Sequence, residues 1–172
     1  MGFLKPERLL KYMGKIESIT QQHIRTQWES QEEVHVFVFV KTFMLNLSFQ
    51  IFFDLNDPER ISKLASKFAF LQFGVQSVPV NIPGTTYYRA HKAAEQIRKE
   101  IQLIIREKCD ALSKGAVMED ILADIIVAEQ AGRYMSNNIA AYNLIMGLML
   151  ANNVSVSNVI TYMIKHIGER AN

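Results

Sequence analysis

A long apolar stretch near the end of the chain is the feature that most constrains its fold. Residues 139–151 read IAAYNLIMGLMLA and carry no charge, and the adjacent amides Asn152 and Asn153 then interrupt the run. With Ser136 as N-cap and Gly168 as stop, the pattern predicts one helix of about 30 residues, roughly 48 Å long at 1.5 Å per residue. A helix this apolar needs cover from several other elements.

The same stretch has two interpretations, a membrane span or the core helix of a globular domain. Its uninterrupted apolar part, 139–151, is shorter than the roughly 20 residues that a span requires, and Asn143 and Asn158 add further amides. We therefore favour a buried core helix. In that case Asn152 and Asn153 need hydrogen-bond partners, because a buried amide without one costs free energy.

The rest of the chain reads as helical with one exception. Apolar residues at steps of three and four predict helices over 7–29, 57–71, 86–112 and 117–129, and 41–54 is apolar almost all round, as in a buried helix. Only VHVFVFV (34–40) alternates and predicts a short strand. The segment 74–84, GVQSVPVNIPG, is an apolar loop that could be a binding edge, a membrane-touching edge or an ordinary connection. We expect a single all-α domain over 1–172, with one short strand.

Composition excludes several classes of function. The chain has 172 residues and a net charge of +2, without a basic cluster, so no nucleic-acid partner is expected. Cys109 could be a nucleophile or a ligand, but with no partner nearby in sequence a surface or half-buried thiol is the simpler interpretation. No metal site is expected, because the histidines lack ligand spacing. They are His23, His35, His91 and His166.

Five motifs are more individual. Residues 81–100 read N-I-P-G-T-T-x-x-R-A-x-K-A-A-x-x-I-R-K-E. The others are F-L-K-P-E (3–7), E-E-V-x-V-F (32–37), D-P-E-R-I-x-K-L (57–64) and M-E-D-I-L (118–122). In order and spacing they resemble plant cytochrome P-450 haem-thiolate monooxygenases, above all the group that oxidises triterpenes such as β-amyrin and taxane diterpenes. The resemblance implies an internal, truncated part of that fold, from the end of helix C to helix I, with helices D to I in one partial domain.

By this resemblance, 136–168 is similar to helix I, whose oxygen-activating signature reads Ala/Gly-Gly-x-Asp/Glu-Thr. The chain has Ala151-Asn152-Asn153-Val154-Ser155 there. Ser155 would keep the catalytic hydroxyl, whereas Val154 replaces the acid and carries no proton. Ala151 and Asn152 would face the haem, and the amides would occupy the position where the family's helix loosens over it.

The resemblance also implies an activity and partners. The parent reaction inserts one oxygen atom into a C–H bond of an apolar terpenoid or sterol, using haem iron and dioxygen, with electrons from a flavoprotein reductase. The substrate-contacting residues would be Phe73, Val75, Val78, Ile82, Met146, Met149, Leu150 and Ala151. Plain core packing is the alternative for the last four.

Other parts of the family pattern are missing. No stretch matches the loop that carries the family's haem-ligand cysteine, so this chain by itself is expected to be inactive. The alternative function is a non-enzymatic helical remnant that binds a partner or a membrane surface. The resemblance implies the cytosolic face of the endoplasmic reticulum membrane, with peripheral contact through 74–84. Without the family's anchor, a cytoplasmic location is the alternative, and helix 136–168 is expected to mediate self-association.

Overall fold

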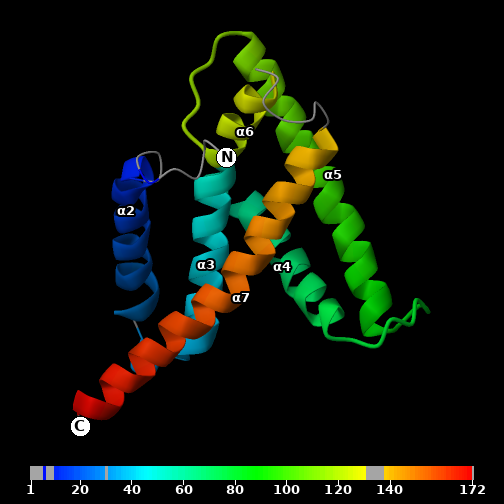
Figure 1. Ribbon diagram of the computed structural model, residues 1–172. Coiled ribbons are helices and arrows are strands. Elements are labelled where there is room, and N and C mark those ends of the chain that lie inside the picture. Colours follow the sequence, from blue (N-terminus) through cyan, green and yellow to red (C-terminus); the bar gives the residue numbers. More distant parts are fainter. Residues whose placement is uncertain (1–5, 7–9, 30, 131–137, 172) are drawn as a thin grey trace.

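The computed structural model describes residues 6, 10–29, 31–130 and 138–171, with only the backbone for 129–130, 138–141 and 171. The elements are a 3-10 turn (Leu10–Tyr12), α2 (Met13–His23), a π-helical turn (Ile24–Trp28), α3 (Val36–Phe53), α4 (Pro58–Val75), α5 (Thr86–Ser113), α6 (Ile121–Gln130) and α7 (Asn138–Ala171) (Figure 1). The all-α prediction is confirmed, and the described residues contain no strand.

The predicted strand at 34–40 is wrong, because α3 already begins at Val36. A lone strand would leave its backbone N–H and C=O groups without partners, whereas a helix satisfies them within the segment. The helical continuation also places Val40 and Met44 on a buried face, 2% and 3% exposed. Burial of one side of the helix from Val40 to Phe53 therefore overrides the local β-propensity of Val and Phe.

Other predicted boundaries shift by a few residues. The predicted helix 7–29 is divided into a 3-10 turn, α2 and a π-helical turn. The last helix does not stop at Gly168 but runs to Ala171, and its predicted cap, Ser136, lies outside the described residues. Asp57 and Thr85 do cap α4 and α5, accepting hydrogen bonds from the backbone N–H of Glu59 and Tyr88.

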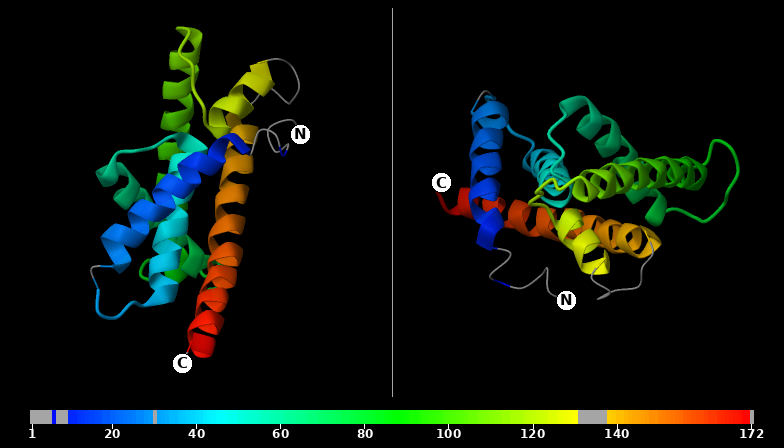
Figure 2. Two further views of the ribbon diagram at one scale, coloured as in Figure 1. Left: turned by 90° about the vertical axis from the view of Figure 1, so that its left-hand side faces the viewer. Right: turned by 90° about the horizontal axis from the view of Figure 1, so that it is seen from above.

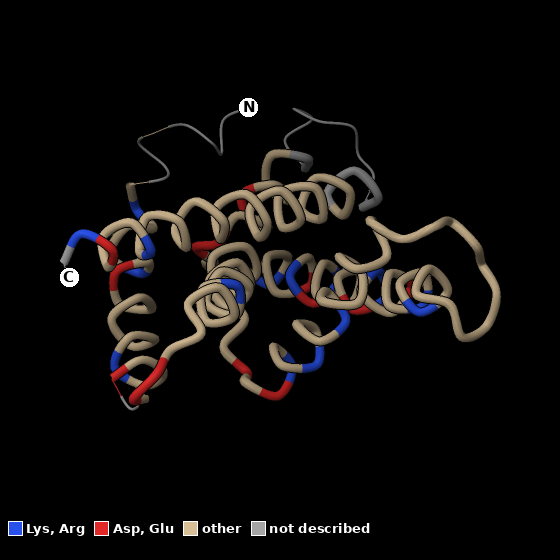
Figure 3. The backbone as a smooth tube through the Cα atoms, turned by 90° about the horizontal axis from the view of Figure 1, so that it is seen from below, with Lys and Arg blue, Asp and Glu red and all other residues tan. Residues whose placement is uncertain are grey.

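The bundle is organised around the crossing of α3 and α7. In Figure 1 the two helices run in opposite directions and cross near their middles, and they contact each other extensively. The two views of Figure 2 show α7 along one side of the bundle, with its last turns extending past the other helices. In Figure 3 this helix lacks charge along most of its length, and its first Lys, Arg, Asp or Glu is Lys165.

The core lies where α3, α4, α5 and α7 meet. Phe49 stacks against Phe53 and meets Phe68 edge-on, with ring centroids 6.3 Å and 5.7 Å apart. The most deeply buried apolar side chains are Phe49, Phe68, Leu64, Ile97, Ile101, Ile105, Leu122, Ile145, Met149 and Val40. They come from helices far apart in sequence, so the described elements share one core.

Two of the described helices pass a length-and-composition test for a membrane span: Val36–Phe53, and the stretch Tyr142–Arg170 of α7. In the bundle 44% of the first window and 28% of the second are buried. Buried core helices pass the same test, so this result does not separate the two classes of protein.

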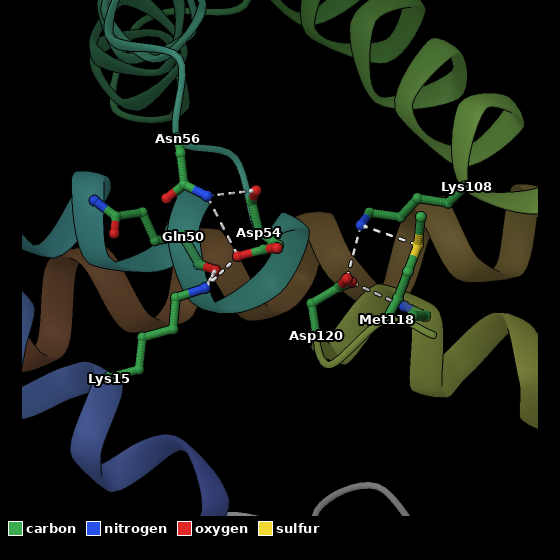
Figure 4. A network of polar contacts seen from close by, with 8 residues as sticks. Lys15, Gln50, Asp54, Asn56, Lys108, Met118 and Asp120 are labelled. Atoms are coloured by element: carbon green, nitrogen blue, oxygen red, sulfur yellow. Dashed lines mark hydrogen bonds and ion pairs between the residues drawn. The ribbon is translucent and has the colours of Figure 1, made fainter. Parts of the chain in front are cut away.

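Polar contacts join α3 to α2 and α5 to α6 (Figure 4). Asp54 ends α3 in a left-handed conformation with φ 50° and forms an ion pair with Lys15, which also donates to the Gln50 carbonyl at 3.1 Å. Asp120 is 1% exposed, accepts from Lys108 Nζ at 2.7 Å and caps α6 through the Ala123 N–H at 2.9 Å. One carboxylate therefore both starts α6 and fastens it to α5.

Helices α4 and α5 form an antiparallel pair that closes tightly at one end. Gly74 is buried there, and a Cβ added to it would lie 2.0 Å from Cβ of Ala90. Any side chain at position 74 would therefore separate the two helices. This close approach fixes the last turn of α4 against the first turns of α5.

We predict that Gly74→Ala destabilises the chain by about 1–3 kcal/mol, because overpacking outweighs the gain in helix propensity. Gly147→Ala in α7 is the matched control: its added Cβ meets nothing within 4 Å, so it should stabilise the chain by up to about 1 kcal/mol. Urea unfolding followed by circular dichroism measures both. Equal stability of Gly74→Ala and the wild type would show that the helices are free to separate there.

Candidate functional site

The two amides in the middle of α7 are hydrogen-bonded to neighbouring helices. Asn152 Nδ2 donates to Oγ of Ser48 in α3 at 3.0 Å, and that hydroxyl donates onward to the Met44 carbonyl at 2.7 Å. Asn153 is 1% exposed and contacts two helices. Its Nδ2 donates to the Lys41 carbonyl of α3 at 3.5 Å, and its Oδ1 accepts from Nε2 of Gln72 in α4 at 2.5 Å.

These contacts explain the polar interruption of the apolar run. Buried amides stabilise a helix interface only when partners satisfy them, and both amides are satisfied by α3 and α4. Helix α7 stays continuous through 151–155 and does not break at the amides. The Asn152 amide nitrogen points at α3, where the hydrogen bond to Ser48 occupies the donor group. The haem contact of Asn152 stays a prediction.

The other side of α7 presents small, exposed residues. Four exposed residues lie on this side, spaced four, three and one positions apart along the helix: Gly147, Ala151, Val154 and Ser155. Ser155 Oγ donates to the Ala151 carbonyl one turn earlier, so its proton is held within the helix. Val154 is 44% exposed and offers no proton. Among these four residues, the Ser155 hydroxyl is therefore the one side-chain polar group.

This face meets part of the requirement for a haem. Small side chains and the open space beside Gly147 would let a flat ring lie close to the helix. Within the described residues, no cysteine thiol lies at this face, because Cys109 lies in α5, half-buried against the core. The described residues also contain no group of three or more His, Cys, Asp or Glu that could hold a metal ion. Among the described residues, the α7 face can supply one wall for the ring, and no cysteine thiol lies beside it.

The structure divides the predicted substrate contacts into separate groups. Four are exposed at the end of α4 and in the following loop: Phe73 (66%), Val75 (72%), Val78 (74%) and Ile82 (59%). Met146 and Met149 lie in the core, 8% and 1% exposed, as the core-packing alternative expects. Leu150 is half-buried against the core and Ala151 lies on the open face. These eight side chains therefore do not line a common cavity in this bundle.

Sequence reasoning missed the residues that hold α7 in place. Ser48 and Gln72 were not singled out, although each is a polar residue within a largely apolar helical segment. A pocket of about 350 Å³ was not foreseen either. It lies between the first half of α4 and the second half of α5. Its lining residues are Asp57, Glu59, Arg60, Lys63, Leu64, Lys67, Glu100, Leu103 and Glu107. None of the predicted site residues belongs to this pocket.

We predict unequal effects at the two adjacent amides. Asn153→Leu leaves the Gln72 amide without its partner near the core and removes the contact with the Lys41 carbonyl, so it should cost about 1–3 kcal/mol of unfolding free energy. Asn152→Leu should cost less than about 1 kcal/mol, because Asn152 is only half-buried and Ser48 keeps its bond to Met44. Urea unfolding compares them. Equal losses would show that the contacts of Asn153 do not govern the interface.

Comparison with known proteins finds similar plant proteins, whereas no protein-family model matches the chain. Over 169 residues it is 34% identical to "Beta-amyrin 28-monooxygenase" of Vitis vinifera, covering 97% of this chain and 35% of that protein. It is also 34% identical to the protein of the same name from Solanum lycopersicum over 171 residues, 98% of this chain and 36% of that protein. Cytochrome P-450 716A1 of Arabidopsis thaliana is 32% identical over 169 residues, 97% of this chain and 35% of that protein.

A solved structure agrees on the fold. The retinoic acid-bound cyanobacterial CYP120A1 superposes with a TM-score of 0.84 at 18% identity, covering 98% of this chain and 38% of that one. The chain thus spans about a third of the length of the proteins that it matches. Homology over nearly its full length, together with this fold, shows that the chain belongs to the cytochrome P-450 family and corresponds to about a third of the length of its plant relatives.

Proposed function

We propose that the chain provides the central helical section of a haem-thiolate monooxygenase that oxidises an apolar triterpenoid or sterol. The observation that carries the proposal is the alignment of almost the whole chain with plant proteins named β-amyrin 28-monooxygenase. The exposed small-residue face of α7 supports it. In this proposal the rest of the enzyme provides the thiolate ligand, and a flavoprotein reductase provides electrons.

The residues of this chain would have distinct roles. When bound, haem supplies the activation of dioxygen. Gly147 and Ala151 would lie against the ring, and the amides of Asn152 and Asn153 would hold α7 at a fixed height through α3 and α4. Ser155 would hold a proton at Oγ, now shared with the Ala151 carbonyl. The exposed apolar residues at the end of α4 would contact the substrate.

Val154 sets a limit on this activity. The corresponding acid of the family relays protons, and a valine side chain has none to give. Proton delivery would then depend on Ser155 and on water that reaches the open face. We infer that a complete enzyme with this sequence would consume electrons without matching product formation, because its proton supply is slow.

The experiment is a replacement of the matched stretch of the Vitis vinifera enzyme by this chain. We expect the chimera to bind haem through the recipient's thiolate and to give the carbon monoxide band of that ligation. Product per electron should be low, and Val154→Asp should raise it at least about tenfold, since positioned proton transfer contributes roughly 10²–10⁴-fold.

One control sharpens that result. Cys109→Ser in the chimera should leave the carbon monoxide band unchanged, because the thiol packs against the core and does not reach the α7 face. A soluble, folded chimera without the band would contradict the proposed role as a P-450 section. Unchanged product yield in the Val154→Asp chimera would contradict the proton-supply argument alone.

A membrane-surface contact through 74–84 would accompany this function. Val75, Val78 and Ile82 are more than half exposed, and Val80 is 40% exposed. Apolar side chains so exposed favour contact with another apolar phase. We propose peripheral binding through this loop at the cytosolic face of the endoplasmic reticulum, where the plant relatives are expected to act.

One observation favours the second candidate function, a non-enzymatic helical protein that binds partners. An exposed apolar stripe runs along α7, with residues spaced three, four and four positions apart. Its members are Val156 (37% exposed), Val159 (57%), Met163 (60%) and Ile167 (66%). Such spacing is typical of a helix–helix contact. No charge occurs in α7 before Lys165, so a second copy of the stripe meets no repulsion.

We therefore predict that the isolated chain self-associates through α7. Val159→Glu with Met163→Glu should shift the chain to a monomer in size-exclusion chromatography with light scattering, because it places charges within the stripe. Asn158→Glu is the matched control on the other exposed face of the same helix and should leave the oligomer intact. A wild-type chain that is already a compact monomer and binds no hydrophobic dye would contradict the prediction.

A further inference from the structure

The pocket between α4 and α5 has no part in the proposed function. Its volume is about 350 Å³, and it lies between the first half of α4 and the second half of α5. Small-molecule sites typically have volumes of about 300–1,000 Å³, so this one suits a small ligand. Leu64, which is 1% exposed, and Leu103, which is 47% exposed, form its apolar part. The remaining lining residues are all charged.

Arg60 holds the two walls of this pocket together. Its Nε donates to Oε1 of Glu100 at 2.6 Å, and its Nη1 donates to Oε2 of Glu107 at 3.2 Å. These carboxylates lie about two turns apart on α5. One guanidinium thus fastens α4 to a whole stretch of α5, so the walls keep their spacing without a ligand. A preformed site saves the ordering that a ligand would otherwise have to impose.

The charges of the lining argue against the simplest ligands. Four of the nine lining residues are acidic and three are basic, so their formal charge is −1 and does not attract a lone anion. A lone cation meets Lys67, whose ammonium has no ion-pair partner within the described part of the chain. The other two cations of the lining are already paired with carboxylates, each at 2.6 Å. The pocket therefore offers both an unpaired cation and an excess of carboxylate.

These two charges lie at opposite ends of the pocket. Asp57 caps the start of α4 through Oδ1, and Glu107 of the antiparallel α5 joins Arg60 at the same end. Each uses one carboxylate oxygen in that contact and has a second. Lys67 lies ten residues after Asp57, about 15 Å along the helix at 1.5 Å per residue. Helical side chains lean toward the N-terminus, so Lys67 leans back toward the carboxylates and shortens that separation.

We propose that this pocket binds a small zwitterion whose two charges are separated by an apolar spacer. The ammonium of the ligand lies between Asp57 and Glu107, its carboxylate or phosphate meets Lys67, and its methylene groups cover Leu64 and Leu103. This site uses none of the residues assigned to haem or substrate. It follows from the contacts of α4 and α5 and does not rest on the proposed function.

The first test compares probes of matched size on the intact chain. Ligand-observed NMR titration gives the dissociation constants of ε-aminocaproate, caproate, hexylamine and glycine. We expect ε-aminocaproate to bind with a dissociation constant in the millimolar range. The three other probes should bind about two- to fivefold more weakly, because each loses the equivalent of one partly exposed ion pair. Equal binding of all four probes, or no binding of ε-aminocaproate, would overturn the proposal.

The second test locates the bound carboxylate. Lys67→Met should weaken ε-aminocaproate about two- to fivefold and leave hexylamine no weaker than before, since it removes only the cation of the pocket. Lys99→Met is the matched control: Lys99 is exposed on α5 beside Glu100 in sequence, but it does not line the pocket. Circular dichroism checks that both variants keep the helical fold. Equal weakening by the two variants would show that binding is a general effect of surface charge.

A charge reversal makes the sharpest prediction. Lys67→Glu changes the formal charge of the lining from −1 to −3, so hexylamine should become the preferred probe and ε-aminocaproate should lose its advantage. Lys99→Glu makes the same change of charge outside the pocket and should keep the wild-type order of probes. An unchanged order in Lys67→Glu would overturn the assigned orientation of the ligand and with it the site.

Discussion

The hydrogen bonds of Asn152 and Asn153 are the constraint on which the arrangement of α7 depends. Apolar packing alone would let an uncharged helix slide or rotate on the bundle, because one apolar contact is much like another. Buried amides permit one register only, since a shift leaves donors and acceptors unpaired at about 1–3 kcal/mol each. Ser48, Lys41 and Gln72 therefore select the crossing of α7 with α3, and that crossing decides which residues face outward.

The remaining buried polar contacts act in the same way at other junctions. Asp120 and Lys108 form an ion pair with side chains 1% and 9% exposed, where removal of one partner would strand the other charge in the core. Arg60 joins Glu100 and Glu107 across the α4–α5 pair, at 2.6 Å and 3.2 Å. Burial by itself would lower the Arg60 pKa, and the hydrogen bonds to these carboxylates more than compensate and raise it. The α5–α6 and α4–α5 pairs thus each have a polar contact that fixes their alignment.

The open face of α7 and the exposed end of α4 follow from this framework. The anchored face uses the amides, so the small residues Gly147, Ala151 and Ser155 are left on the opposite side. The close contact of Gly74 with Ala90 pins α4, so its apolar end projects from the bundle. In a protein that matches about a third of the length of its P-450 relatives, these are two surfaces that the described helices leave uncovered.

Local sequence pattern determined the helices, and tertiary structure decided how their polar residues are used. The period of the apolar residues predicted the helices from α4 to α6, because a helix that buries one face must repeat near 3.6 residues. The long apolar run at 139–151 predicted α7. The motif at 81–100 indicated the family, which the relatives confirm. The predicted strand failed at 34–40, since the propensity of seven residues cannot register that Val36–Phe53 continues as one helix whose later turns are buried in the core. Likewise no local pattern shows that Asn153 meets Gln72, 81 residues away in sequence, because that contact exists only once α4 and α7 are both in place.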